Sequence, residues 1–328
     1  MTLTKTLPLC LGLLTLGACD TSLSVSQDTG ASQIALQATQ LPYGPELPSP
    51  LVPLDWWMDH RKDPGLVLID ARSGQDYAAN HLPGAIHLHY EETYDAVDHR
   101  HWKVASLPAI NRLFSSKGIT TSQTIVIYGT SEDFRSSARL FWVFELFGHP
   151  SVGVLNGNTG TFLAHGGELE SDPSVLPPSR FVGELDPRRL ATKLEVKQAL
   201  RDDSVVLLDT RSRDQFTGQN GWEGLEHWGR IPGALNMPPE SLYKSEGGGC
   251  ELPRMDEIPS IYQEVGGNSL ITYCNAGHEA TVSYLLFRSI GVSAAVYDGS
   301  WIEWSSDPGL PRAKGDQENL PTEGRIDG

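Results

Sequence analysis

Cysteine is scarce in this chain, and its few cysteines do not form a framework. The four are Cys10, Cys19, Cys250 and Cys274. Four are too few for a disulfide-stapled fold, and no two of them show the short paired spacing of a zinc site. Stability must therefore come from a packed apolar core, and any cysteine chemistry must use a single thiol.

Positive charge is also in short supply. Lysine and arginine together number 25 against 41 aspartates and glutamates, so the net charge is −16. This balance argues against a nucleic-acid partner, and it repels anionic substrates at long range. Any anion must then be bound by local dipoles and a few arginines.

The ten histidines are scattered and are not paired with cysteines at metal-ligand spacing. We interpret the group between residues 81 and 101 as loop and surface residues, and we predict no metal site. The members of that group are His81, His87, His89, His99 and His101.

Long apolar runs are absent except near the start. Lys5 precedes an apolar run over residues 7–16, which is too short to span a bilayer and is typical of a signal peptide. The run ends in Leu16-Gly17-Ala18-Cys19, which resembles the bacterial lipobox. The resemblance implies that Cys19 becomes the lipidated first residue of a protein anchored on the periplasmic side of a bacterial cell envelope. Ordinary cleavage nearby, without lipidation, is the alternative.

The stretch over residues 20–48 is rich in Ser, Thr, Gln, Gly and Pro and lacks a hydrophobic period. It is predicted to be a flexible tether.

The remaining chain contains an internal repeat. Apolar segments and turn motifs recur in the same order in two halves, and each half alternates short continuous apolar runs with helical patterns. The matching pairs are 66–72 with 205–211, 81–86 with 230–235, 125–128 with 270–273, 147–148 with 290–291, and 154–157 with 296–299.

Continuous apolar runs fit strands of a parallel sheet that are buried on both faces, and the helical stretches supply the crossovers. The fold class is therefore α/β, with two similar domains. We assign a signal peptide to residues 1–19, the first domain to 49–165, a linker to 166–186, the second domain to 187–310 and a polar surface tail to 311–328.

Cys274 stands where the second copy changes from a strand pattern to a helix pattern. The apolar run Leu270-Ile271-Thr272-Tyr273 ends at the cysteine, and a helical period begins after a short loop. Backbone N–H groups of such a loop can turn inward to form an anion-binding nest that lowers a thiol pKa. The residues of the predicted nest are Asn275, Ala276, Gly277, His278, Glu279 and Ala280. A buried cysteine with no chemical role is the alternative.

The doubled pattern resembles the rhodanese family of sulfurtransferases over about residues 50 to 310. The motifs that carry the resemblance are Leu-Leu-Asp-Thr-Arg over 207–211, Arg-Ile-Pro-Gly-Ala-Leu-Asn over 230–236, Tyr-Cys-x-x-Gly over 273–277 and Tyr-Asp-Gly-Ser-Trp over 297–301. Tandem members of this family carry an inactive first domain and an active second one. This chain fits that pattern, because Gly129 follows the shared tyrosine where the second half has Cys274.

The resemblance implies two tandem rhodanese-like domains and a two-step transfer. Cys274 takes a sulfane sulfur from a small anionic donor such as thiosulfate or 3-mercaptopyruvate, becomes a persulfide, and passes the sulfur to a thiol or cyanide. No metal or organic cofactor is required. The resemblance also places Asp209 and Arg211 beneath the loop as its support and Arg230 beside the substrate pocket, although the first two could equally form a purely structural ion pair.

The loop departs from the familiar members at two positions. Asn275 stands where a basic residue is usual, and Glu279 stands where threonine or arginine is usual. The acidic side chain of Glu279 should disfavour doubly charged thiosulfate, so the identity of the sulfur donor stays open. His278 could place a donor or positive group at the mouth.

Three other functions compete with this one. A phosphatase needs an arginine six residues after the cysteine to clamp phosphate, and Ala280 occupies that place. A non-catalytic tandem module that binds persulfides or a partner protein remains open. So does thiol–disulfide exchange between Cys274 and Cys250, which follows three glycines.

Overall fold

The structure, a computed structural model, describes residues 44–95, 103–130, 132–241, 243–246, 249–253, 256–258, 262–263 and 269–316. The predicted signal peptide, its lipidation site Cys19 and the tether before residue 44 lie outside these ranges, as do His99, His101 and Ser131. Within the described ranges, no helix combines the length and the apolar character needed to cross a bilayer.

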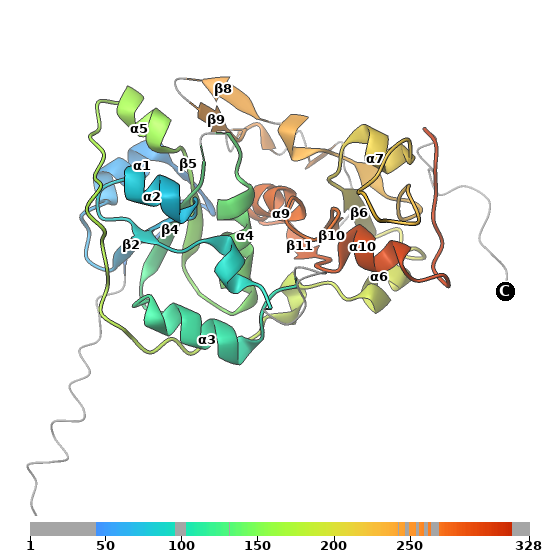
Figure 1. The fold of residues 1–328 in the computed structure, drawn as a ribbon, viewed down its shortest axis with the longest axis horizontal. Helices are drawn as coiled ribbons and strands as arrows, with labels where there is room; N and C mark the ends of the chain where they lie inside the picture. The colour runs from blue at the N-terminus through green and yellow to red at the C-terminus, as the bar shows by residue number, and fades with distance from the viewer. Residues whose placement is uncertain are drawn as a thin grey trace, which may run out of the picture. The chain divides into compact units, whose positions relative to one another are not determined.

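The first half contains a five-stranded parallel sheet in the order β1-β5-β4-β2-β3 (Figure 1). Its strands are β1 (Leu51–Pro53), β2 (Leu66–Asp70), β3 (Ile86–His87), β4 (Thr124–Tyr128) and β5 (Val152–Asn156). Its helices are α1 (Leu54–His60), α2 (Gly74–Ala79), η2 (Tyr90–Thr93), α3 (Leu107–Ser116), α4 (Arg135–Leu146) and α5 (Thr159–Ala164).

The second half repeats this plan with a four-stranded parallel sheet in the order β11-β10-β6-β7, plus an antiparallel hairpin. The strands are β6 (Val205–Asp209), β7 (Leu235–Asn236), β10 (Ser269–Tyr273) and β11 (Ser293–Val296), with β8 (Lys244–Glu246) and β9 (Gly249–Glu251) in the hairpin. The helices are η3 (Pro187–Arg189), α6 (Lys193–Ala199), α7 (Arg213–Thr217), η4 (Pro239–Ser241), α9 (Ala280–Arg288) and α10 (Ser300–Ser305). The α/β class with two mostly parallel sheets is confirmed.

Strand registers align the two halves. Tyr128 lies opposite Asp70 in the β2–β4 pair, and Tyr273 lies opposite Asp209 in the β6–β10 pair. Because all these strands are parallel, the residue after each tyrosine emerges at the carboxyl edge of its sheet. Cys274 therefore occupies in the second half the place that Gly129 occupies in the first.

Burial on both sheet faces explains the continuous apolar runs. In β4, the side chains of Ile125 and Ile127 enter one core cluster, and those of Val126 and Tyr128 enter another on the opposite face. All five β4 residues are buried.

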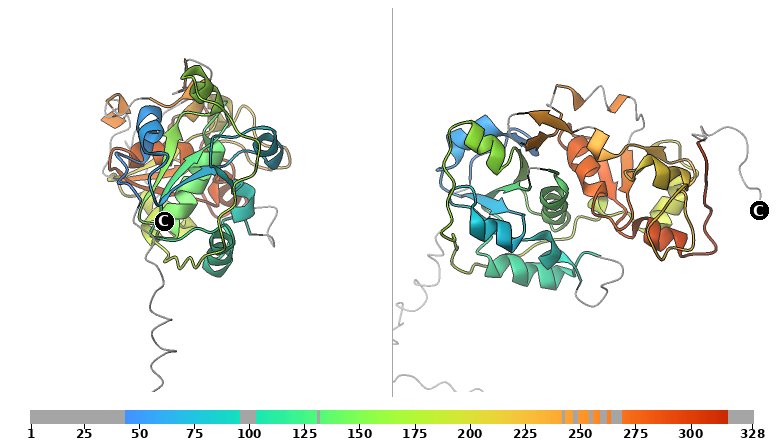
Figure 2. Two further views of the ribbon diagram at one scale, coloured as in Figure 1. Left: turned by 90° about the vertical axis from the view of Figure 1, so that its left-hand side faces the viewer. Right: turned by 45° about the horizontal axis from the view of Figure 1, so that its top comes forward.

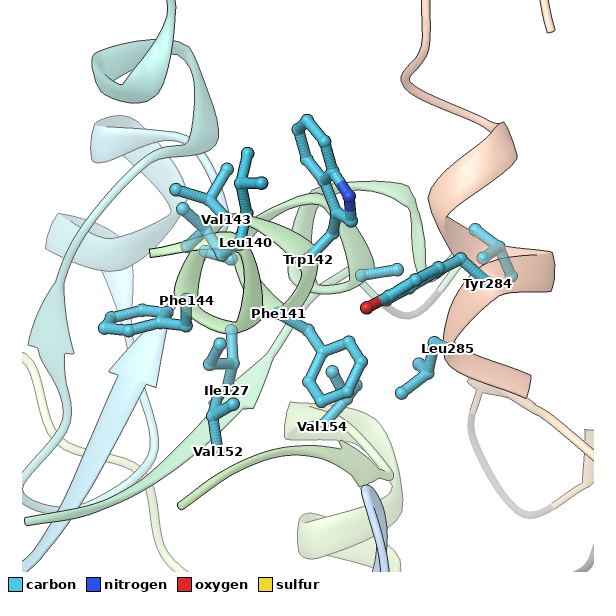
Figure 3. Packing of buried hydrophobic residues seen from close by; sticks show 14 of the residues in the cluster. Ile127, Leu140, Phe141, Trp142, Val143, Phe144, Val152, Val154, Tyr284 and Leu285 are labelled. Atoms are coloured by element: carbon cyan, nitrogen blue, oxygen red, sulfur yellow. The ribbon is translucent and has the colours of Figure 1, made fainter. Parts of the chain in front are cut away.

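One of the apolar core clusters spans both halves along α4 and α9. Figures 1 and 2 show these two helices side by side, and Figure 3 shows Phe141 of α4 facing Tyr284 and Leu285 of α9. The rings of Phe141 and Tyr284 are 6.0 Å apart. Both helices are buried on nearly every side because each is covered by its own sheet and by the other helix.

The segment assigned as a linker is packed rather than free. It pairs with the first half through the bridges His81–Glu170 and Ile86–Ser174, and Phe181 is buried in the shared core. The interpretation of His81 as a surface residue is wrong: the ring is fully buried, with its nitrogens beside the carbonyls of Tyr77 and Asp172.

The start of the predicted surface tail is also packed. Ala313 forms a bridge with Arg230, Leu310 is buried, and the backbone N–H of Gly315 donates to Thr217. The predicted tail therefore runs along the surface of the second half and contacts it as far as residue 316. Its apolar and backbone groups find partners on the second half that composition alone does not reveal.

Candidate functional site

Cys274 is held at the carboxyl edge of the second sheet by the start of α10. Its N–H donates to Ser300 Oγ at 3.2 Å, and its carbonyl accepts from Trp301 N–H at 3.0 Å. Ser300 adopts φ +49°, a strained left-handed conformation for a residue with a side chain. The side chain of Cys274 is a free thiol and is only 2% exposed.

Three backbone N–H groups of the loop interact with this thiol and lower its pKa. They belong to Ala280, Ala276 and Glu279, and each favours the thiolate form. Burial outweighs them: it raises the pKa of the Cys274 thiol above its ordinary value, and the negative charge of Glu279 adds to the rise. The sequence-based expectation of a lowered thiol pKa is therefore wrong for the resting site, since the covering of the loop by the rest of the chain exceeds the effect of the nest.

Gly277 makes the loop's sharp turn, with φ +77°. A Cβ at this position would lie 2.6 Å from Asp298 Oδ1, closer than any side chain can pack. Arg139 Nη1 donates to the Gly277 carbonyl at 3.0 Å and to Asp298 Oδ1 at 2.6 Å. The turn thus needs glycine because a buried ion pair sits against it.

His278 is enclosed rather than exposed at the mouth. Its ring stacks on Tyr90 of the first half, with centroids 4.3 Å apart. Burial and the positive charges of Arg139 and Arg135 lower the pKa of His278 to about 3. The imidazole is therefore neutral at physiological pH, and it does not supply the positive charge considered from the sequence; its Nε2 atom is buried without a hydrogen-bond partner.

Glu279 faces a cation from the other half. Its Oε1 lies 3.6 Å from Arg135 Nη1, and Arg135 is itself held by Asp133, with Nη2 2.7 Å from Oδ2. Burial and the nearby Glu240 carboxylate raise the pKa of Glu279 above its ordinary value. The carboxylate is not turned away from the site, because its charge acts on the thiol of Cys274.

Asn275 is packed against α7. Its Nδ2 donates to Gln215 Oε1 at 3.3 Å, and its Oδ1 atom is buried without a partner. Its carbonyl accepts from Ile302 N–H at 3.1 Å. The loop is thereby tied down on its α7 and α10 sides.

Asp209 and Arg211 form a buried fork below the loop. Arg211 Nε donates to Asp209 Oδ1 at 2.9 Å, and Nη2 donates to the Gly229 carbonyl at 2.8 Å. The first half has the same arrangement, with Arg72 Nε donating to Asp70 Oδ1 at 3.0 Å. Because the copy without a thiol keeps the pair, its geometry indicates a structural support common to both domains.

Arg230 lies over the ring of Phe216, 4.4 Å from the centroid, and its Nη1 donates to the Gly315 carbonyl at 2.8 Å. These contacts place it against the packed start of the tail. Nearby in the sequence, Trp222 and Trp228 are 41% and 39% exposed.

The equivalent loop of the first half has no thiol at its apex. Gly129 replaces the cysteine, and a Cβ there would lie 3.1 Å from Ser137 Oγ. Ser137 donates to the Phe134 carbonyl at 3.1 Å, a local helix contact. Within the described ranges, no group of three or more histidine, cysteine, aspartate or glutamate side chains could hold a metal ion.

Sequence reasoning missed Arg139. It lies in the apolar helix α4 of the half that carries no thiol, yet it reaches the active loop. The available signal was a lone arginine inside the otherwise apolar stretch Ala-Arg-Leu-Phe-Trp, because a charge in such a stretch needs a buried partner.

Comparison with known proteins identifies the repeated unit. A family model described as a rhodanese-like domain matches residues 54–162 and again residues 192–307. The thiosulfate sulfurtransferase of Cricetulus griseus is 30% identical, with 74% of this chain and 85% of the relative covered. The sulfur carrier protein TtuD of Thermus thermophilus is 26% identical, over 82% of this chain and 98% of the relative.

Solved structures show the same fold. The anaerobic ergothioneine biosynthesis enzyme from Chlorobium limicola, in complex with trimethyl histidine, superposes with a TM-score of 0.70 at 22% identity, over 82% of this chain and 71% of that one. The structure of YnjE gives a TM-score of 0.69 at 22% identity, over 83% and 70%.

Proposed function

Because this chain belongs to the rhodanese-like family and is a tandem-domain sulfurtransferase, we propose that it transfers a sulfane sulfur through a persulfide on Cys274. One observation carries the proposal. A single buried thiol stands at the end of β10 with three backbone N–H groups directed at its sulfur. That arrangement suits a nucleophile that becomes an anion and then carries one.

In the first step, the Cys274 thiolate attacks the outer sulfur of the donor. For thiosulfate, a new S–S bond forms at Cys274, the donor's S–S bond breaks, and sulfite leaves with the electron pair. The terminal sulfur of the persulfide then holds the negative charge that the loop N–H groups stabilise.

In the second step, a thiolate or cyanide attacks the terminal sulfur of the persulfide. The bond from the acceptor to that sulfur forms as the persulfide S–S bond breaks, and Cys274 returns as a thiolate. The N–H groups of Ala276, Glu279 and Ala280 serve both steps, because the same loop faces the thiolate and the persulfide anion. Asp209 and Arg211 act as the support below.

The raised thiol pKa bears on the first step. At neutral pH the resting thiol is mostly protonated, so the thiolate available to attack increases with pH. A donor whose own charge is small would meet less repulsion from Glu279 than thiosulfate does. The charge of Glu279 therefore favours a donor less charged than thiosulfate.

The test is cyanide-dependent release of thiocyanate from thiosulfate, and separately from 3-mercaptopyruvate, by the wild type, Cys274→Ser and Cys250→Ser. Turnover should vanish in Cys274→Ser and persist in Cys250→Ser. Retention of turnover in Cys274→Ser would show that Cys274 is not the nucleophile. Loss of turnover in both variants would favour thiol–disulfide exchange between the two cysteines.

A sulfur-carrier role is a second candidate, and the likeness to the Thermus thermophilus carrier protein favours it. A carrier would hold the persulfide until a partner protein collects it. Slow release to cyanide, combined with full persulfide loading, distinguishes a carrier from an enzyme with rapid small-molecule turnover. For either role we propose the lipid-anchored, periplasmic location that the segment ending in Cys19 implies.

A further inference from the structure

Arg139 is a fully buried cation from the first half. Its guanidinium carbon lies 4.4 Å from the ring centroid of Trp142 and 5.0 Å from that of Tyr94. Burying a charge costs several kcal/mol unless a partner compensates. A buried arginine in a largely apolar helix therefore indicates that its charge is needed for a specific contact.

Both hydrogen-bond acceptors of Arg139 lie in the second half. Its Nη1 donates to the Gly277 carbonyl in the active loop and to Asp298 Oδ1 before α10, while Asp298 Oδ2 accepts the N–H of Val104. Arg139 Nε and Nη2 are buried and have no hydrogen-bond partner in the described structure. One guanidinium nitrogen thus fixes the carbonyl at the turn of the loop.

We propose that Arg139 is a positioning residue for Cys274: by fixing the left-handed turn at Gly277 it aims the loop N–H groups at the thiol. The first half, which has glycine where the second has cysteine, then becomes a required part of the site. The effect of Arg139 on the rate of sulfur transfer rests on the proposed function, whereas its effect on the pKa of the Cys274 thiol does not.

Arg139 acts on the thiol in two ways. Rotation of the Gly277 peptide would move the adjoining N–H groups of the nest, and a misplacement of about 1 Å can cost roughly 100-fold in rate. The positive charge of Arg139 also interacts favourably with a negative charge on Cys274. Loss of either contribution destabilises the thiolate, so both predict the same direction of change.

The α4–α9 interface offers a matched control. Glu145 of α4 accepts from Arg288 Nη2 at 3.0 Å, and this ion pair joins the same two helices without bonding to the active loop. Glu145→Gln weakens the interface alone. Arg139→Gln removes the positioning contact and the charge, and Arg139→Lys keeps the charge but replaces the planar guanidinium, whose Nη1 reaches both acceptors, by an ammonium on a different stem.

The experiment uses the full chain and measures the thiol pKa of Cys274 from peptide-resolved iodoacetamide labelling against pH. Thiocyanate release and thermal unfolding are recorded on the same preparations. We expect the thiol pKa to rise by about half a unit or more in Arg139→Gln, with at least tenfold slower sulfur transfer. Arg139→Lys should fall between Arg139→Gln and the wild type, and Glu145→Gln should keep the wild-type thiol pKa.

An unchanged thiol pKa in Arg139→Gln and Arg139→Lys would overturn the proposal, as would equal shifts in Glu145→Gln and Arg139→Gln. If Arg139→Gln does not fold, the thiol pKa of Cys274 measured in Arg139→Lys by the same labelling serves as the test. A raised thiol pKa in a protein that transfers no sulfur at all would uphold the positioning role and refute the proposed function.

Discussion

Glu279→Gln should make Cys274 a stronger acid and thiosulfate a better donor. The substitution keeps the shape of the side chain and removes its charge. The negative charge of Glu279 raises the pKa of the Cys274 thiol, and we take a charge separation of about 6 Å for the calculation. At that distance, two unit charges interact by roughly 2–3 kcal/mol at an effective dielectric near 20.

Screening by solvent and by a nearby cation reduces this interaction energy. The Glu279 side chain is 27% exposed and is partly neutralised by Arg135 at 3.6 Å. About a third to a half of the interaction, roughly 1 kcal/mol, then remains, and this corresponds to somewhat less than one pKa unit. Because the carboxylate disfavours the thiolate, its removal must lower the thiol pKa. The alkaline rise of sulfur transfer should accordingly begin at lower pH in Glu279→Gln.

The assay is the pH profile of iodoacetamide labelling at Cys274, together with kcat/KM for thiosulfate and for a singly charged donor, at low and moderate salt. The thiosulfate specificity constant should rise several-fold, more than that of the other donor, and the gain should shrink as salt rises. Arg135→Gln is the control of opposite sign, because it leaves the Glu279 carboxylate without its cation. Equal effects on both donors, or effects that ignore salt, would refute the electrostatic reasoning.

Two further predictions concern the parts of the chain outside the loop. Residues 180 to 328 expressed alone should lose activity and solubility, because they lack Arg139 and expose the α9 face that covers α4; a soluble fragment with full activity and unchanged donor preference would contradict this. Cys19→Ala should release the protein from the membrane fraction of a bacterial host, whereas a wild type found wholly in the soluble fraction would contradict the lipid anchor.

The repeat in the sequence predicted the architecture well. Matching motifs placed Gly129 and Cys274 at equivalent strand ends, and the registers Tyr128–Asp70 and Tyr273–Asp209 confirm that equivalence. The success has a physical reason: a buried parallel strand followed by a loop and a helix leaves a local hydrophobic signature in both copies.

Features that depend on contact between the halves were not predictable in this way. The acidity of Cys274 was misjudged because the burial that raises its pKa depends on packing that the loop sequence does not record. His278 was open to interpretation for the same reason, since Tyr90 encloses it from the first half. Arg139 was missed because its partners Gly277 and Asp298 lie far along the chain.

The most direct test of sulfur transfer through Cys274 is intact-mass analysis of the protein after incubation with thiosulfate and removal of the excess. If Cys274 carries the sulfur, the protein gains the mass of one sulfur atom, located on the peptide containing Cys274, lost on addition of cyanide and absent in Cys274→Ser. A wild-type protein that gains no sulfur from thiosulfate or 3-mercaptopyruvate, or that carries the added sulfur on Cys250, would contradict it.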